Sequence, residues 1–84
     1  MGKIANMRNA YNSISPNISV DEIFKIAGMP DSVVGTYYDG ILTWQDSVWK
    51  GIFRGGIVYR KLIVFTRGGK IVQYSSENLN VSSW

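Results

Sequence analysis

The side chains that carry most enzymatic chemistry are missing from this sequence. Its 84 residues include no cysteine and no histidine, so the chain has no thiolate nucleophile and lacks the commonest general base and metal ligand. Asp39 and Asp46 flank a predicted turn and could be considered as a pair of catalytic acids. Asp39 is better explained by Asp-Gly turn chemistry, and Asp46 by an exposed or Arg-paired position on a strand. We therefore predict no catalytic residue, no metal and no cofactor, and a protein that is not an enzyme.

Positive charge is concentrated in the second half of the chain. The formal net charge is +3, yet residues 47–76 contain no acid and hold the cations Lys50, Arg54, Arg60, Lys61, Arg67 and Lys70. Such an asymmetry indicates an anionic partner: nucleic acid, lipid headgroups or an acidic protein surface. Aromatic residues lie among these cations, a combination that single-strand binders use, but no RNP, KH or helix-turn-helix motif accompanies them. Nucleic acid is therefore the less favoured partner, and a solvated basic face on an ordinary sheet is the alternative.

The glycine-containing segment 51–56, GIFRGG, has a composition that suggests a loop. It lacks the spacing of a phosphate-binding loop and does not open a helix, so we interpret it as a mobile hairpin tip. Ile52 and Phe53 on such a tip would be exposed apolar anchors, the residue types that dominate interface energetics. The alternative is that both fold back on the sheet edge. The predicted partner-binding surface combines these two residues and the outer sheet face with a rim of cations, Arg54, Arg60, Lys61 and Arg67.

Two short helices precede this segment. Ile4, Met7, Tyr11 and Ile14 recur at helical spacing and predict a helix over residues 3–14. A second helix, over residues 20–27, has both ends specified: Ser19 can cap its start, Glu22 completes a capping box, and Gly28 with Pro30 ends it. Because isolated helices of this length are marginal in water, the second helix must pack its apolar side chains on something else. Those side chains are Ile23, Phe24, Ile26 and Ala27.

The remainder of the chain predicts that packing partner, a sheet. Strands are expected over residues 32–38, 41–49, 57–66 and 70–75, with turns at Asp39-Gly40 and Arg67-Gly68-Gly69. The fold class is thus α+β, with two short N-terminal helices packed on a three- to four-stranded antiparallel meander sheet as a two-layer sandwich. Residues 1–84 form one domain, in which the tail 76–84 is expected to be loose. One sheet face should carry Tyr59, Ile63, Phe65 and Ile71, and the other Leu62, Val64 and Val72.

The order of residues between positions 14 and 30 resembles the signature of the SmpA/OmlA lipoprotein family, also called BamE-like. The matching positions read Ile14-x-x-Asn17-Ile18-Ser19-x-x-Glu22-Ile23-x-x-x-Ala27-Gly28-x-Pro30, against a family pattern of I-x-x-G-M-T-x-x-[QE]-V-x-x-x-[LA]-G-x-P. Trp44 would stand on the aromatic strand of the family, and Phe65, Gly69 and Ile71 in its closing pattern. The sequence departs from the family at Asn17 and Ile18, and it lacks the lipid-bearing cysteine and the signal peptide.

The resemblance implies an αα-βββ fold and a non-enzymatic binding or scaffolding module of the cell envelope, docking a protein partner or an anionic membrane surface. The best-known member of the family is an accessory subunit of the outer-membrane β-barrel assembly machine, and the secreted β-lactamase inhibitor protein has a similar architecture. We expect the periplasmic side of the outer membrane if a signal was removed, and the cytoplasm if Met1 is the native start. The alternatives are a small basic nucleic-acid-binding protein and a phage- or plasmid-type inhibitor of a host protein. An exposed strand edge also allows a homodimer.

Overall fold

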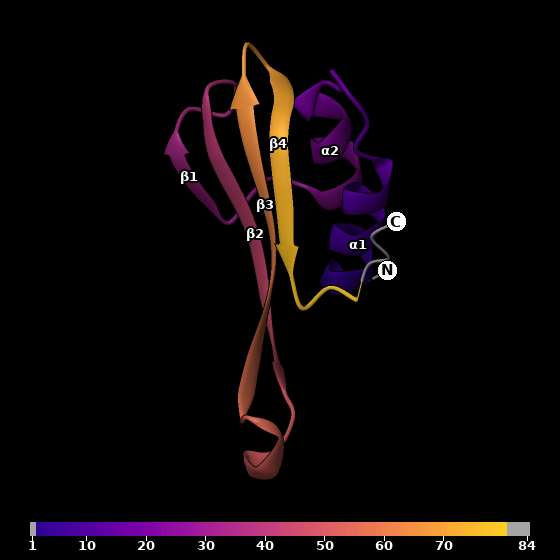
Figure 1. Ribbon diagram of the computed structural model, residues 1–84, viewed down its shortest axis with the longest axis vertical. Helices are drawn as coiled ribbons and strands as arrows, with labels where there is room; N and C mark the ends of the chain where they lie inside the picture. Colours follow the sequence, from indigo (N-terminus) through magenta and orange to yellow (C-terminus); the bar gives the residue numbers. More distant parts are fainter. Residues whose placement is uncertain (1, 81–84) are drawn as a thin grey trace.

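Two helices cover one face of a four-stranded antiparallel sheet in the computed structural model, which describes residues 2–80 (Figure 1). The helices come first in the chain, and the strands follow as a meander in the spatial order β1-β2-β3-β4. This arrangement confirms the predicted α+β class. The elements are α1 (Lys3–Ser13), α2 (Val20–Ala27), β1 (Ser32–Gly35), β2 (Gly40–Trp49), a 3-10 turn η1 (Ile52–Arg54), β3 (Ile57–Arg67) and β4 (Lys70–Glu77).

Helix α2 begins and ends where the sequence predicts. The Ser19 hydroxyl accepts a hydrogen bond from the backbone N–H of Asp21 at 3.2 Å, which satisfies one free donor of the first turn. Gly28 ends the helix with φ 77°, a conformation that glycine adopts without a Cβ penalty. The Glu22 carboxylate pairs with Lys25 at 3.2 Å, so its expected return contact to the cap residue is replaced by a pairing within the helix.

The core lies between the helices and the sheet. Ile23 of α2 is fully buried, and Trp44 of β2 is fully buried while its indole N–H donates to the Gly28 carbonyl at 3.1 Å. That bond joins the end of α2 to the sheet, and the Phe24 ring lies 6.2 Å from the Trp44 ring. The packing of α2 on the sheet is thus confirmed. The buried apolar residues are Met7, Ala10, Val20, Ile23, Leu42, Trp44, Leu62, Val64, Ile71 and Leu79.

A bulge in β4 changes the predicted assignment of sheet faces. Phe65 pairs with Gln73, and the next residue of β3, Thr66, pairs with Ile71, which leaves Val72 as an extra residue. Ile71 is therefore buried on the helix side with Leu62 and Val64, while Val72 is 63% exposed. The prediction placed Ile71 on the face away from the helices and Val72 on the face with Leu62 and Val64. It was wrong because it assumed an uninterrupted alternation of side chains along β4.

The first hairpin is also longer than the Asp39-Gly40 signal predicts. β1 ends at Gly35, which pairs with Gly40, and residues 36–39 form the loop. The loop is closed locally, because the Asp39 N–H donates to the Thr36 hydroxyl at 3.0 Å. Gly40 opens β2 instead of completing a two-residue turn, and a Cβ there would lie 2.4 Å from two backbone oxygens. The predicted strand over 32–38 therefore ends three residues early.

The segment expected to be a loose tail from residue 76 is instead part of the fold. β4 continues to Glu77, and Leu79 is only 1% exposed within the core. Two arginines hold the backbone on either side of that contact: the Arg60 guanidinium donates to the Asn78 carbonyl at 3.0 Å, and the Arg8 Nε donates to the Leu79 carbonyl at 2.7 Å. The chain after β4 consequently returns toward α1 (Figure 1). Residues 81–84 of the predicted tail lie outside the described residues.

Candidate functional site

The β2–β3 hairpin projects beyond the rest of the molecule as a two-stranded arm, which we define as residues 46–60 (Figure 1). β1 pairs with β2 only over residues 40–43, and β4 pairs with β3 only from residue 61 onward. Over the arm the two strands therefore pair only with each other, as in the pairs Asp46–Arg60 and Trp49–Ile57. The arm makes the molecule elongated, with extents of 44 × 28 × 22 Å.

The tip of the arm is a structured loop. The Lys50 N–H donates to the Gly56 carbonyl at 2.8 Å, and the Gly56 N–H donates to the Gly51 carbonyl at 2.9 Å. Between these bonds the chain makes one turn of 3-10 helix, η1. Gly51, Gly55 and Gly56 all have positive φ angles, of 90°, 95° and 69°, which side chains other than glycine rarely tolerate. The glycines of the segment therefore shape a tip that holds residues 52–54 away from the sheet.

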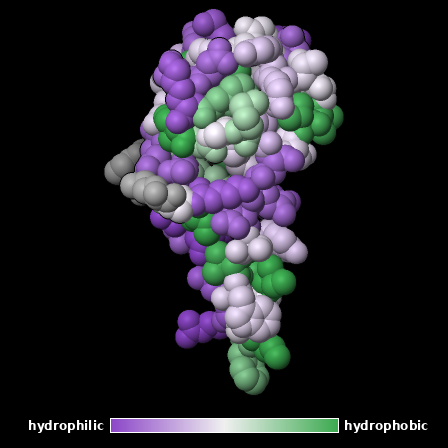
Figure 2. Space-filling view, turned by 180° about the vertical axis from the view of Figure 1, so that it is seen from behind, coloured by the Kyte–Doolittle hydropathy of each residue, from purple (hydrophilic) through white to green (hydrophobic). Residues whose placement is uncertain are grey.

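Large apolar side chains are exposed along the arm and at its tip, as Figure 2 shows for one face. Phe53 is 102% exposed and Ile52 79% exposed, so the alternative in which they fold back on the sheet edge is wrong. Trp49, Ile57 and Tyr59 are each about half exposed or more. With about 200 Å² for each fully exposed large side chain, these five expose on the order of 700 Å². A monomer rarely shows one apolar patch of more than about 300–600 Å².

The backbone edges of the arm are less available than its side chains. Next to the start of β1, the Asp31 carboxylate accepts from the Gln45 N–H at 2.8 Å, and the Asp46 carboxylate accepts from the Ser47 N–H at 2.8 Å. Where β4 ends, the Asn78 side chain donates to the Tyr59 carbonyl at 2.9 Å. Side chains thus occupy the edge groups at the base of the arm, where strand pairing from β1 or β4 would otherwise continue. Contact with a partner is left chiefly to the exposed apolar side chains.

The structure does not bring the four predicted rim cations together. Arg54 is exposed at the tip beside Phe53. Arg60 is only 8% exposed and binds the Asn78 carbonyl, and its Nε has no hydrogen-bond partner among the described residues. Lys61 is half-buried between Gln45 and Glu77 on neighbouring strands. Arg67 lies at the opposite end of β3, about 33 Å along the strand from Ile57, where the strand leaves the tip of the arm.

The exposed arm therefore carries a different set of residues from the one predicted. Lys50 and Arg54 are its exposed cations, and Trp49, Ile57 and Tyr59 join the two predicted anchors. The alternation of apolar residues in two facing strands is the sequence signal that could have found these three. The length of the overhang was missed because it depends on where β1 and β4 end.

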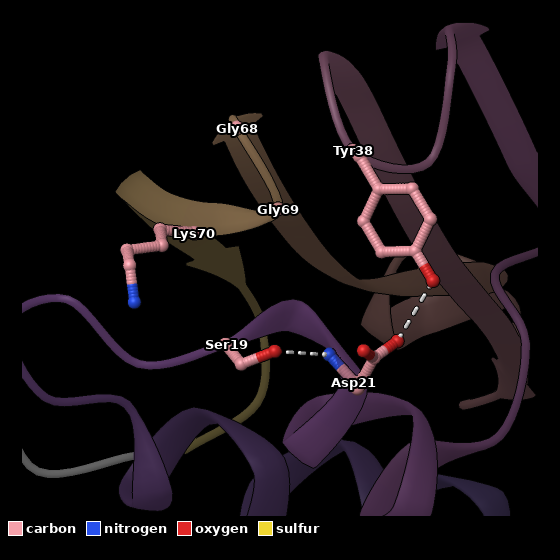
Figure 3. Close-up of a pocket in the computed structure, with 6 residues that line it drawn as sticks. All are labelled: Ser19, Asp21, Tyr38, Gly68, Gly69 and Lys70. Atoms are coloured by element: carbon pink, nitrogen blue, oxygen red, sulfur yellow. Dashed lines mark hydrogen bonds between the residues drawn. The ribbon is translucent and has the colours of Figure 1, made fainter.

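A separate hollow of about 480 Å³ lies at the start of α2, between the β1–β2 loop and the β3–β4 turn (Figure 3). The Tyr38 hydroxyl donates to the Asp21 carboxylate at 3.0 Å, and this hydrogen bond, together with the charge of Asp21, raises the pKa of Tyr38. Lys70 lies to one side of this pair in Figure 3 and donates to the Asn17 carbonyl at 3.4 Å. The polar groups of the hollow are thus hydrogen-bonded within the protein, in an arrangement that joins α2 to two turns.

Other kinds of site are not found in the part of the chain that the structure describes. Within residues 2–80 no three acidic side chains lie close enough to hold a metal ion. None of the helices in that range has the length and apolar character needed to cross a membrane. No protein-family model matches the chain, and no curated protein matches it. The arm is consequently the feature on which a function can be argued.

Proposed function

We propose that this protein is a non-enzymatic binding module that inserts its arm into an apolar groove of a protein partner. The observation that carries the proposal is the near-complete exposure of Phe53 and Ile52 at the end of a structured hairpin. The exposed apolar area of the arm, about 700 Å², is close to the roughly 800 Å² that each partner contributes to a standard interface. Exposed tryptophan, tyrosine and arginine are also the residue types that most often dominate binding.

The charge of the arm indicates which residues should surround that groove. Lys50 and Arg54 are exposed on either side of Ile52 and Phe53, and the chain has no acid between Asp46 and Glu77. A complementary partner would place acidic residues around an apolar floor, which speeds association and excludes basic competitors. Binding would also support the arm itself, since an isolated two-stranded hairpin is marginally stable in water.

An envelope scaffold of the SmpA/OmlA type is the setting that we propose for this binding. The support is the order of two helices followed by an antiparallel meander, with Ser19 and Gly28 capping α2 at two positions of the family signature. An inhibitor of a host protein would use the same arm in the same way. The nucleic-acid alternative has weaker support, because Arg60 is buried and Arg67 lies far from the arm, so the cations do not follow the exposed aromatic residues along one path.

Retention of the partner by immobilised protein tests the proposal. Phe53→Ala should reduce retention of a specific protein from the cells that make this chain, while the free energy of unfolding stays within about 0.5 kcal/mol of the wild type. Val34→Ala is a matched control, because Val34 is 63% exposed on β1, away from the arm. Equal retention by the wild type and Phe53→Ala would contradict the proposal. Cosedimentation of the wild type with phosphatidylglycerol vesicles, lost in Phe53→Ala, would favour a membrane surface instead.

A further inference from the structure

Most of the free strand edges of this sheet are short or covered. β1, the strand at one side, has only four residues. At the other side, the segment before α2 pairs with the start of β4: the Val20 N–H donates to the Gly69 carbonyl at 2.9 Å, and the Ile71 N–H donates to the Ile18 carbonyl at 3.0 Å. At the base of the arm, side chains bind the Ser47 N–H and the Tyr59 carbonyl of the two edges. Short edges and covered edges are the usual means of preventing strand pairing between molecules.

Residues 72–77 of β4 are the exception. Beyond the bulge, this stretch has no proline and no lysine, the residues that commonly protect an edge strand. Among residues 2–80, no hydrogen bond joins its outer side to another segment. Next to it lies an apolar hollow of about 300 Å³, whose lining includes Tyr74, which is 42% exposed. This edge of the main body of the sheet is therefore open.

The ladder shows which backbone groups of this edge point outward. The Thr43 carbonyl accepts from the loop that precedes β1, so the backbone groups of Thr43 face away from β3. Its partner Ile63 then turns its own groups toward β4, and the partner of Ile63, Ser75, faces β3 in return. Because direction alternates along a strand, Tyr74 and Ser76 present their N–H and C=O groups to the open edge.

We propose that two copies of this chain pair through these edges, antiparallel, about a two-fold axis at Ser75. In this register Tyr74 of each copy lies opposite Ser76 of the other, and both residues of each pair have outward backbone groups. The pairing makes four backbone hydrogen bonds and one continuous eight-stranded sheet. An axis at Tyr74 would place an inward-facing residue in the ladder, and an axis at Ser76 would place a residue beyond the end of β4 in it. Either axis would make fewer backbone hydrogen bonds.

The side chains of this edge are compatible with self-pairing. We therefore infer that a second copy of the chain pairs with it. Gln73 of each copy falls opposite Glu77 of the other, so an amide that can donate meets a carboxylate and no like charges are opposed. Ser75 meets its own counterpart, which is small and uncharged. Tyr74, on the helix side, gains cover from the second strand. The interface does not involve the arm, so it is independent of the proposed function.

A charge pair at one position tests both the interface and its register. By sedimentation velocity at rising concentration, Gln73→Glu should weaken the dimer, because it opposes two carboxylates twice, and Gln73→Lys should strengthen it. Two opposed pairs change at once, so we expect roughly a two- to thirtyfold change in the dissociation constant in each direction. Ser76→Pro removes an outward N–H without touching the β3 ladder and should give a monomer with an unchanged circular dichroism spectrum.

Phe53→Ala is the control for this series and should dimerise like the wild type. Amide exchange at Tyr74 and Ser76 should slow as the dimer forms, which gives a readout that does not depend on any substitution. A wild type that stays monomeric up to millimolar concentration would overturn the proposal. So would equal responses to Gln73→Glu and Gln73→Lys, or a dimer lost only in Phe53→Ala, which would place the contact on the arm.

Discussion

Replacing Leu79 with alanine should cost a large part of the stability of this protein, although the residue lies after the last strand. Leu79 is 1% exposed and belongs to the main core. Its backbone is held by Arg8, which donates to the Leu79 carbonyl at 2.7 Å, and the preceding carbonyl is held by Arg60 at 3.0 Å. If the segment detached after the side chain was shortened, it would also lose these two hydrogen bonds.

The magnitude follows from the burial of Leu79. Removing a fully buried leucine side chain forfeits about 1.5–3 kcal/mol of transfer free energy, and the cavity that remains raises the total for Leu→Ala to about 2–5 kcal/mol. Because only a short segment needs to move to close the cavity, we expect about 2–4 kcal/mol. For a domain of this size that lowers Tm by roughly 8 °C or more.

Chemical denaturation, followed by circular dichroism, measures the effect. Phe53→Ala removes a larger apolar side chain, but one that is 102% exposed, and it should change the free energy of unfolding by less than about 0.5 kcal/mol. The two substitutions together compare burial with exposure in one chain. A loss below about 0.5 kcal/mol for Leu79→Ala would refute the inclusion of this segment in the core.

Substitutions at three further positions test separate parts of the structure. Ser19→Ala should destabilise the protein by about 1 kcal/mol and Ser19→Gly by a few tenths, as measured by denaturation, since the hydroxyl caps α2. Burial alone would raise the pKa of Asp31, but the hydrogen bond and charge of Lys3, together with a backbone N–H, outweigh it and lower that pKa. The contribution of the ionised Asp31 to stability is therefore complete above the unfolded pKa of this residue, near 4. It is lost as the pH falls through the lowered pKa of Asp31 in the folded state. Asp31→Asn should flatten this acid dependence in a series of melts, and an unchanged slope would contradict the pairing. Arg60→Met should lower stability by about 1–3 kcal/mol, because the Asn78 carbonyl loses its donor, and should leave partner retention unchanged; a selective loss of retention would restore Arg60 to the binding surface.

The features that were predicted correctly are those that a few neighbouring residues decide. Ser19 and Gly28 determine the ends of α2 through a hydroxyl and a missing Cβ, and neither effect needs a distant contact. The Gly68-Gly69 turn between β3 and β4 is of the same kind, with φ angles of 58° and 76°. Ile23 could be placed in the core because a helix so short must pack on another element.

The features that were missed depend on pairing between distant strands. Ile71 and Val72 exchange faces because one residue bulges out of β4, and the sequence KIVQYSSE has no local mark of that position. Arg60 is buried because the chain after β4 passes over it, which its place in a basic segment does not reveal. Only the tip of the arm was predicted, because the length of the arm depends on how far β2 and β3 extend beyond the ends of β1 and β4.

A photo-crosslinking residue at position 53 would test whether the arm docks on a protein, because it reports what the tip of the arm touches in the cells that make this chain. We predict a discrete protein adduct that is absent when the same residue replaces Val34. Excess wild-type protein, but not Phe53→Ala protein, should compete this adduct away. Adducts with lipid alone, or the same adducts from both positions, would contradict the claim that the arm binds a protein partner.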